Sequence, residues 1–385
     1  MNSGIKGARC AAGATARRRF LAGAAAWAAL PAAATPQAPV HLRWQGAWSA
    51  RDIFHEYALD YAKRVNDMSG GRLRIEVLPG GAVVKPRDLL EAVHKGVLDG
   101  CHALPELWLG KSTAFSLFGA GPALGMDADN FLAWMEYGGG RALYDELQHR
   151  QLAFEVVGFL YGPMPTQPLG WFRKPVNSPA QFKGLRFGAT GMAVQLYREM
   201  GANATELAAD EAVAALGDGR LDGAAFNNAS SDLELGLPEA ARHCMLQSYH
   251  RTAEVFEILI NRKRFDALAA DLKAILKYAA EAASAGMSWK AIHRYSQDQA
   301  RMRDKEGRRF HRTPASVLRA QMEAWRAVAA RASKDNPFFA RVLESQLAWA
   351  RRTVGWRLDT EVDPRVAYDH WFGMQPAPAK GGKNG

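Results

Sequence analysis

Cysteine is scarce in this sequence, because the 385 residues include only three. Cys10 lies in an N-terminal stretch that we expect to be removed, which leaves Cys101 and Cys244. Each stands in an apolar, strand-like run, where a cysteine behaves as a small hydrophobic side chain. An oxidising compartment would permit a bridge between them, but we predict two buried free thiols.

Catalytic and cofactor motifs are also missing. The ten histidines form neither H-E-x-x-H nor H-x-H, and none neighbours a C-x-x-C, so the sequence does not support a dedicated zinc site. There is no P-loop, G-x-S-x-G or G-x-G-x-x-G, and no haem-attachment or iron–sulfur spacing. These absences favour binding over catalysis, so we predict that the chain is not an enzyme.

Acidic residues are absent from the first 34 positions, which hold five basic residues and then an alanine-rich apolar run. A run of about 15 residues is short for a membrane span, which needs about 20. The R-R-R-F-L segment at 17–21 is similar to a twin-arginine export signal, and A-A-A at 32–34 fits a cleavage site. We predict a twin-arginine-type signal peptide over residues 1–34 and a periplasmic location.

Removal of this leader lowers the formal net charge from +10 to about +5. The remaining basic residues are scattered, apart from a dense stretch at 301–312. That stretch is interleaved with Asp304 and Glu306 rather than with aromatic residues. We therefore predict a solvated helix face there and no nucleic-acid partner.

Two similar units of helix and strand follow the leader. A helical pattern at 53–65 separates two alternating, strand-like segments, which indicates a β-α-β arrangement. A glycine, an L-D-G motif and a small-residue strand occur at 96–103 and again at 219–226. The repeat predicts an α/β fold of two lobes whose strand ends open onto a shared cleft.

Beyond residue 252 the chain becomes mainly helical, with helices started by Thr313-Pro314 and by Asn336-Pro337. These helices carry more apolar residues than two lobes require, so we expect them to brace the hinge and also to pack on a second protomer. The predicted division is a signal peptide at 1–34, lobe I at 35–162 completed by part of 252–350, lobe II at 163–251, a returning strand with hinge-spanning and C-terminal helices at 252–375, and a disordered tail at 376–385.

A resemblance to a known family rests on the segments Q-P-L-G-W-F-R-K-P at 167–175, F-K-G-L-R-F at 182–187, L-Y-R-E-M-G-A at 196–202, 222–236, N-R-K at 261–263 and D-L-K at 271–273. These segments resemble the solute-binding subunits of TRAP (tripartite ATP-independent periplasmic) transporters. The similarity extends over essentially all of 40–350 and is closest to the branch that binds α-keto and related organic acids. It implies a two-lobed periplasmic-binding-protein-like fold with a hinge-bracing helix and long C-terminal helices, one of which can be exchanged between the protomers of a dimer.

The resemblance implies one site residue and shows that others are altered. Gln167 matches a glutamine that helps to hold a sodium ion between protein and ligand in that branch. Gly188 stands where an arginine grips the substrate carboxylate, while Ala225 and Arg251 stand where acidic residues are expected. Because hard cations prefer oxygen ligands, the sequence does not support a sodium or calcium site of the family type, and we predict no cofactor.

Arg251 offers the forked donor that Gly188 lacks, so we expect it to bind an anionic solute directly. The alternative is that Arg251 lies on the surface. The other candidates also have alternatives, namely a polar turn for the asparagines and core packing for the aromatic residues. The predicted ligand-binding residues are Gln167, Phe226, Asn227, Arg251, Trp171, Tyr249, Asn228 and Trp44.

The function predicted from these features is that of an extracytoplasmic receptor. It would close on a small, carboxylated organic solute and deliver it to TRAP-type membrane subunits, without catalysing a reaction. Three alternatives stay open: an exported enzyme on the same scaffold, a sensor subunit that signals to a partner, and a divergent receptor for a neutral or aromatic solute.

Overall fold

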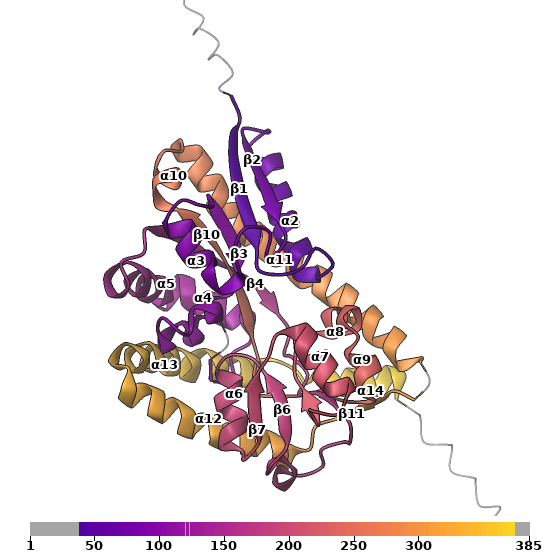
Figure 1. Cartoon of the computed structure of the whole chain (residues 1–385). Helices are drawn as coiled ribbons and strands as arrows, with labels where there is room; N and C mark the ends of the chain where they lie inside the picture. The colour runs from indigo at the N-terminus through magenta and orange to yellow at the C-terminus, as the bar shows by residue number, and fades with distance from the viewer. Residues whose placement is uncertain (1–37, 120, 123, 306, 374–385) are drawn as a thin grey trace, which may run out of the picture. The chain divides into compact units, whose positions relative to one another are not determined.

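The computed structural model describes residues 38–119, 121–122, 124–305 and 307–373, so the predicted signal peptide and C-terminal tail lie outside the described residues. It contains a five-stranded sheet in the order β2-β1-β3-β10-β4 and a six-stranded sheet in the order β11-β9-β5-β8-β6-β7 (Figure 1). The predicted two-lobed α/β fold is therefore confirmed. Among the described residues, no helix combines the length and apolar character that a membrane crossing requires.

We call the first sheet and its helices the first lobe, and the second sheet and its helices the second lobe. The first sheet consists of β1 (Val40–Gly46), β2 (Leu73–Leu78), β3 (Gly100–Ala103), β4 (Val156–Met164) and β10 (Glu254–Asn261), and the second of β5 (Gly170–Phe172), β6 (Arg186–Ala189), β7 (Asn203–Glu206), β8 (Gly223–Ala224), β9 (His243–Met245) and β11 (Arg309–His311). The helices and helical turns of the first lobe are α2 (Ile53–Met68), η1 (Pro86–Asp88), α3 (Leu89–His94), η2 (Pro105–Trp108), η3 (Thr113–Phe118), α4 (Ala128–Tyr137), α5 (Gly140–Asp145) and η4 (Glu146–Gln151). Those of the second lobe are η5 (Pro179–Phe182), α6 (Met192–Glu199), α7 (Ala209–Gly217), α8 (Ala229–Leu235) and α9 (Leu237–Ala240). The chain then continues through five more helices, which are α10 (Arg262–Asp266), α11 (Ala270–Arg303), α12 (Ala315–Asp335), α13 (Pro337–Thr360) and α14 (Pro364–Phe372).

The repeated L-D-G motif has the same geometry in both lobes. In the first lobe, the Asp99 carboxylate accepts a hydrogen bond from the backbone N–H of Arg43 at 2.8 Å, just before β3 begins. In the second lobe, the Asp222 carboxylate accepts one from the backbone N–H of Arg186 at 3.0 Å, just before β8 begins. β3 is parallel to β1, and β8 is parallel to β6. The aspartate thus ties each small-residue strand to its parallel neighbour.

The second sheet separates two apolar cores. Trp171 and Phe172 are consecutive residues of β5, so their side chains point to opposite faces of the sheet. Trp171 packs with the cluster that includes Leu216, whereas Phe172 packs with the cluster that includes Phe187. Cys101 and Cys244 are both buried and free, as predicted.

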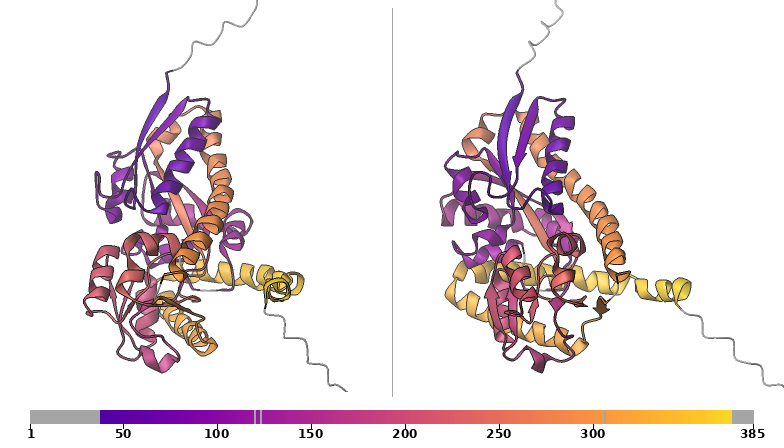
Figure 2. Two further views of the ribbon diagram at one scale, coloured as in Figure 1. Left: turned by 90° about the vertical axis from the view of Figure 1, so that its right-hand side faces the viewer. Right: turned by 45° about the vertical axis from the view of Figure 1, so that its right-hand side comes forward.

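Helix α11 contacts both lobes, as expected of a hinge-bracing helix (Figure 2). On the side of the first lobe, the Tyr61 hydroxyl of α2 donates to the backbone carbonyl of Leu276 at 2.9 Å. On the side of the second lobe, the Ser230 hydroxyl of α8 donates to the buried carboxylate of Asp298 at 2.6 Å. One continuous helix therefore joins the two lobes independently of the connecting strands.

The last three helices differ in their burial. Trp325 of α12 and Phe339 of α13 are buried in the first-lobe core, and α12 also packs on α6 of the second lobe. The Asn336 side chain caps α13 by accepting from the N–H groups of Phe338 and Phe339. By contrast, every residue of α14 is exposed. The apolar face of α14 is thus unpartnered among the described residues.

The basic stretch at 301–312 does not form a single helix face, so that prediction was wrong. Helix α11 ends at Arg303, and Gly307 has a φ of 82°. Residues 309–311 then form β11, which pairs with β9 in parallel. Glycine adopts left-handed backbone without strain, which allows the chain to leave the helix and enter the sheet here.

Candidate functional site

Polar side chains of the two lobes contact each other directly. Arg87 of η1 forms an ion pair with Glu206 of β7 at 2.8 Å, and both side chains are exposed. The Ser231 hydroxyl of α8 donates to the carboxylate of Asp52, which caps α2, at 3.1 Å. The described state therefore has the two lobes in contact rather than apart.

Arg251 also takes part in these contacts, from the segment between β9 and β10. Only 3% of the residue is exposed, so it is not a surface arginine. Its Nη2 donates to Glu106 Oε2 of the first lobe and, at 3.3 Å, to Thr190 Oγ1 of the second. Its backbone carbonyl accepts from the N–H of Gln167 at 3.1 Å. These bonds place a buried guanidinium group at the junction of the lobes.

Glu106 supplies the first-lobe side of this junction. It belongs to η2, which directly follows β3, and Pro105 begins that turn. Its Oε1 accepts from the backbone N–H of Met192 at 3.2 Å, in the first turn of α6. The residue before Met192 is Gly191, with a φ of 58°, and a Cβ at this position would overlap the Glu106 carboxylate. The backbone at the start of α6 thus leaves room for a carboxylate.

The structure brings two of the predicted amide side chains together. Gln167 Nε2 donates to Asn227 Oδ1 at 3.4 Å, and both residues are buried. Phe226, the residue before Asn227, is half-buried. The Asn228 side chain instead accepts from the N–H groups of Ser230 and Ser231, which caps α8. Gln167 thus bonds to Asn227 through its side chain and to Arg251 through its backbone, while the Asn228 side chain caps α8.

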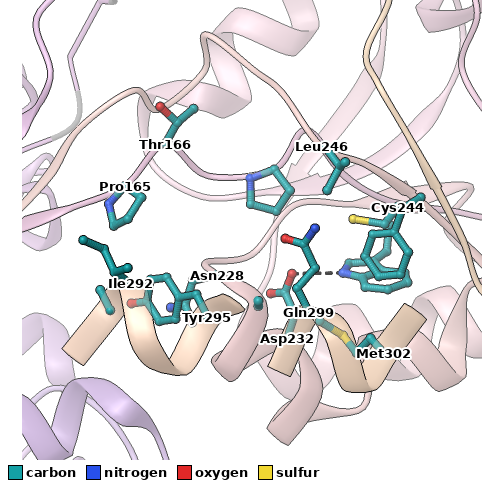
Figure 3. A pocket seen from close by; sticks show the side chains of 15 residues that line it. Pro165, Thr166, Asn228, Asp232, Cys244, Leu246, Ile292, Tyr295, Gln299 and Met302 are labelled. Atoms are coloured by element: carbon teal, nitrogen blue, oxygen red, sulfur yellow. Dashed lines mark hydrogen bonds between the residues drawn. The ribbon is translucent and has the colours of Figure 1, made fainter. Parts of the chain in front are cut away.

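Trp171 belongs to a second site on the other face of β5. Its Nε1 donates to the Asp232 carboxylate at 2.9 Å, the bond drawn as a dashed line at Asp232 in Figure 3. Burial raises the pKa of Asp232 to about 7. Both residues line a cavity of about 180 Å³ between the second sheet, α8 and α11, together with Asn228, Tyr295 and Met302 (Figure 3).

Tyr249 and Trp44 lie in different surroundings. Tyr249 is 38% exposed, and its backbone carbonyl accepts from Trp325 Nε1 of α12 at 2.6 Å. The next residue, His250, is buried, and burial together with the Arg251 charge lowers its pKa to about 3, so the ring is neutral. Trp44 is 1% exposed and stacks on Tyr61 in the first lobe, with ring centroids 5.6 Å apart.

Sequence reasoning missed Glu106, Thr190 and Asp232. The internal repeat held a signal for the first of these, because Glu106 follows the first-lobe strand about as closely as Asn227 and Asn228 follow the equivalent second-lobe strand. Ligand-binding groups gather at such strand ends in open α/β sheets. Thr190 and Asp232 had no comparable signal, because their roles depend on long-range contacts.

The described residues contain no group of three or more histidine, cysteine, aspartate or glutamate side chains placed to hold a metal ion. Ala225, at a position where the resemblance implies an acidic residue, is buried and apolar. Arg251, at the other such position, already pairs with Glu106. The junction thus pairs one basic with one acidic side chain, beside two amide side chains that can form hydrogen bonds.

Comparison with known proteins places this geometry in context. The sequence profile of the family described as bacterial extracellular solute-binding protein, family 7, matches residues 45–335. A monocarboxylate 2-oxoacid-binding periplasmic protein of Nostoc is 29% identical over 218 residues, which is 57% of this chain and 59% of that relative's length. The chain thus spans somewhat more than half of that curated relative.

Solved structures of TRAP transporter solute-binding proteins share the fold. The protein from Bordetella bronchiseptica has a TM-score of 0.79 at 23% identity over 87% of this chain and 97% of its own, and is described as a mixed-occupancy dimer with calcium and picolinate. The protein from Pseudoalteromonas atlantica has a TM-score of 0.77 at 25% identity over 87% of this chain and 99% of its own, with sodium and pyruvate bound. These family and fold neighbours are binding proteins rather than enzymes.

Proposed function

Because the chain belongs to family 7 of the bacterial extracellular solute-binding proteins, we propose that it is the extracytoplasmic receptor of a TRAP-type transporter and binds a small carboxylated solute between its lobes. One observation carries the proposal, namely the buried guanidinium group of Arg251 at the junction of the lobes. An arginine fork pairs with a carboxylate through charge-assisted hydrogen bonds, which are strong where water is excluded. The usual family arginine, replaced by Gly188, thus has a substitute from another segment.

The neighbouring residues have complementary roles in this proposal. Gln167 and Asn227 offer amide groups to a second polar atom of the solute, such as a keto oxygen. Phe226, which is half-buried against the cluster that contains Trp171, and the 38% exposed Tyr249 supply apolar contacts in this proposal. In this proposal Trp171, Asn228 and Trp44 support the site without contacting the solute, because their side chains bond or pack within their own lobes. The solute is held and released, and no bond in it is made or broken.

The chemical class of solute is proposed from the buried Arg251 together with what the relatives are named for. One relative is named for monocarboxylate 2-oxoacids, and one solved relative holds pyruvate. Short 2-oxo acids are therefore the first candidates for this chain. The solved relatives contain calcium or sodium, but here Ala225 and Arg251 replace acidic residues, so we propose that solute binding needs no cation.

The remaining parts of the proposal concern location and assembly. Residues 1–34 direct the chain to the periplasm by the twin-arginine route, and the closed receptor then meets the membrane subunits of its transporter. The exposed apolar residues of α14 favour a homodimer formed through the C-terminal helices.

Isothermal titration calorimetry on protein without residues 1–34 tests the binding site. Wild-type protein should release or absorb heat with pyruvate or picolinate, whereas Arg251→Ala should abolish the signal. Arg326→Ala, at an exposed position of α12, removes an equal charge and should bind as the wild type does. Replacing potassium with sodium should change the affinity little. Unchanged binding by Arg251→Ala would contradict the proposal, and a requirement for sodium would contradict the cation-free site.

A further inference from the structure

Glu106 is a carboxylate that the first lobe inserts against the anion-binding groups of the second. We propose that Glu106 occupies the position that the solute carboxylate takes when it binds to Arg251 and to the backbone N–H of Met192, a position we call the seat. Glu106 then competes with the solute for the seat, which makes it a determinant of affinity and specificity. The inference rests on the function proposed above for Arg251.

The contacts of Glu106 are those that a bound carboxylate would need. One oxygen accepts from Arg251 Nη2, and the other accepts from the N–H of Met192 at 3.2 Å. Arg251 is held in turn by Thr190 Oγ1 at 3.3 Å. The Glu106 and Arg251 side chains are only 8% and 4% exposed, so the pair is shielded from water. Two carboxylates cannot share so small a buried site, because like charges in close contact repel strongly.

Gly191 shapes the seat from the second lobe. Its φ of 58° belongs to a region that favours glycine, and a Cβ there would overlap Oε1 of Glu106. Because position 191 has no side chain, the backbone at the start of α6 can lie close to a carboxylate group. The seat is built by Arg251 and by the start of α6, whereas its present occupant comes from the first lobe.

The turn that carries Glu106 is bonded to the first sheet. Trp108, in the same η2 turn, donates its Nε1 proton to the buried carboxylate of Glu257 on β10. The turn is thus anchored to the first sheet, so Glu106 moves with the first lobe and leaves the seat when the lobes open. The apparent affinity for a solute is then reduced by the fraction of molecules in which the seat is filled.

Because of this competition, only solutes that bind strongly enough to displace Glu106 are bound. A carboxylate with no further contacts, such as acetate, would have to displace Glu106 through charge alone. A 2-oxo acid gains additional bonds from Gln167 and Asn227 and displaces Glu106 more readily. Glu106 therefore discriminates against small anions that lack a second polar group.

The test compares Glu106→Gln with the wild type by calorimetry, with pyruvate and acetate as probes. The amide keeps the shape of the side chain but loses the charge that competes for Arg251, so pyruvate affinity should rise about tenfold or more. Acetate binding, weak or absent in the wild type, should become measurable. The matched control is Glu206→Gln, which removes an equal charge from another contact between the lobes and should leave both affinities unchanged.

A second variant, Glu106→Ala, guards against effects peculiar to the amide. It should also bind pyruvate more tightly, and small-angle scattering should show a larger radius of gyration without solute than the wild type has. Pyruvate affinity in both Glu106 variants equal to or below that of the wild type overturns the inference but leaves the receptor function standing. If neither the wild type nor any variant binds a carboxylate, the proposed function fails and the inference fails with it.

Discussion

The carboxyl group of Glu257 leads to a prediction about pH dependence that can be worked out from the structure. Glu257 is 0% exposed on β10 and accepts hydrogen bonds from the indole N–H of Trp108 and the hydroxyl of Tyr144. Burial raises its pKa from 4.5 to about 7, although the two donors partly oppose this shift. At pH values between these two, the folded protein keeps a proton that the unfolded chain has released.

The sign of the effect follows from this difference in bound protons. Since the folded state binds more protons, this carboxyl makes the free energy of unfolding fall as the pH rises from 4.5 to about 7. A difference of about 2.5 pKa units corresponds to about 3 kcal/mol. Glu257→Gln keeps an oxygen acceptor and the shape of the side chain but cannot ionise. Relative to the wild type, the variant should therefore gain about 3 kcal/mol of stability between pH 4.5 and pH 8.

Urea unfolding followed by tryptophan fluorescence, repeated at half-unit steps of pH, measures this difference. Other buried groups titrate as well, because burial lowers the pKa of His102 and of His250 to about 3. Their contribution is common to both proteins and cancels in the comparison. Glu323→Gln, at an exposed position of α12, controls for the loss of one charge. A stability difference between wild type and Glu257→Gln that does not vary with pH would refute the reasoning.

Three further predictions concern a helix cap, a buried hydrogen bond and the exposed helix α14. Asn336→Ala removes the cap of α13 and should lower the free energy of unfolding by about 1 kcal/mol, and an unchanged urea midpoint would count against the capping role. Trp171→Phe removes the hydrogen-bond donor to the buried Asp232 and should lower the free energy of unfolding by about 1–3 kcal/mol. The loss should be larger at pH 8 than at pH 5, because the carboxylate is charged at pH 8. Equal losses at both pH values would argue against this. Deletion of residues 362–385 removes α14 and should reduce the mass measured by light scattering from dimer to monomer while the melting temperature stays the same, and a dimer that survives the deletion would exclude α14 as its interface.

Much of the fold could be predicted because it depends on short-range patterns. The L-D-G motif at 96–103 and 219–226 marked both lobes, since an aspartate just before a buried strand bonds to the neighbouring strand in each. The Asn336-Pro337 start of α13 was equally readable, because a cap involves backbone groups only two and three residues away. The stretch at 301–312 misled the prediction, because its composition suits a solvated helix while pairing with β9 makes part of it a strand.

The candidate site was only partly predictable. Gln167, Asn227 and Arg251 came from the resemblance and from their positions at strand ends. The structure links them through a side-chain bond between Gln167 and Asn227 and a backbone bond between Gln167 and Arg251. Glu106 was missed because its place just after the first-lobe strand, although repeated in the second lobe, does not show that it will bond to an arginine 145 residues further along the chain. The aromatic candidates, Trp44 and Trp171, were ambiguous because a tryptophan at a strand end suits a core and a binding wall equally well.

The amino-acid sequence by itself determined the α/β class, the repeat of two lobes, the capped C-terminal helices and the family, because these depend on periodicity, turn chemistry and motifs read over a few residues. Only the tertiary structure decided which charges face each other across the lobes. That choice depends on how β10 returns to the first sheet and how η2 approaches α6, so that an acid and a base far apart in the chain share one buried space.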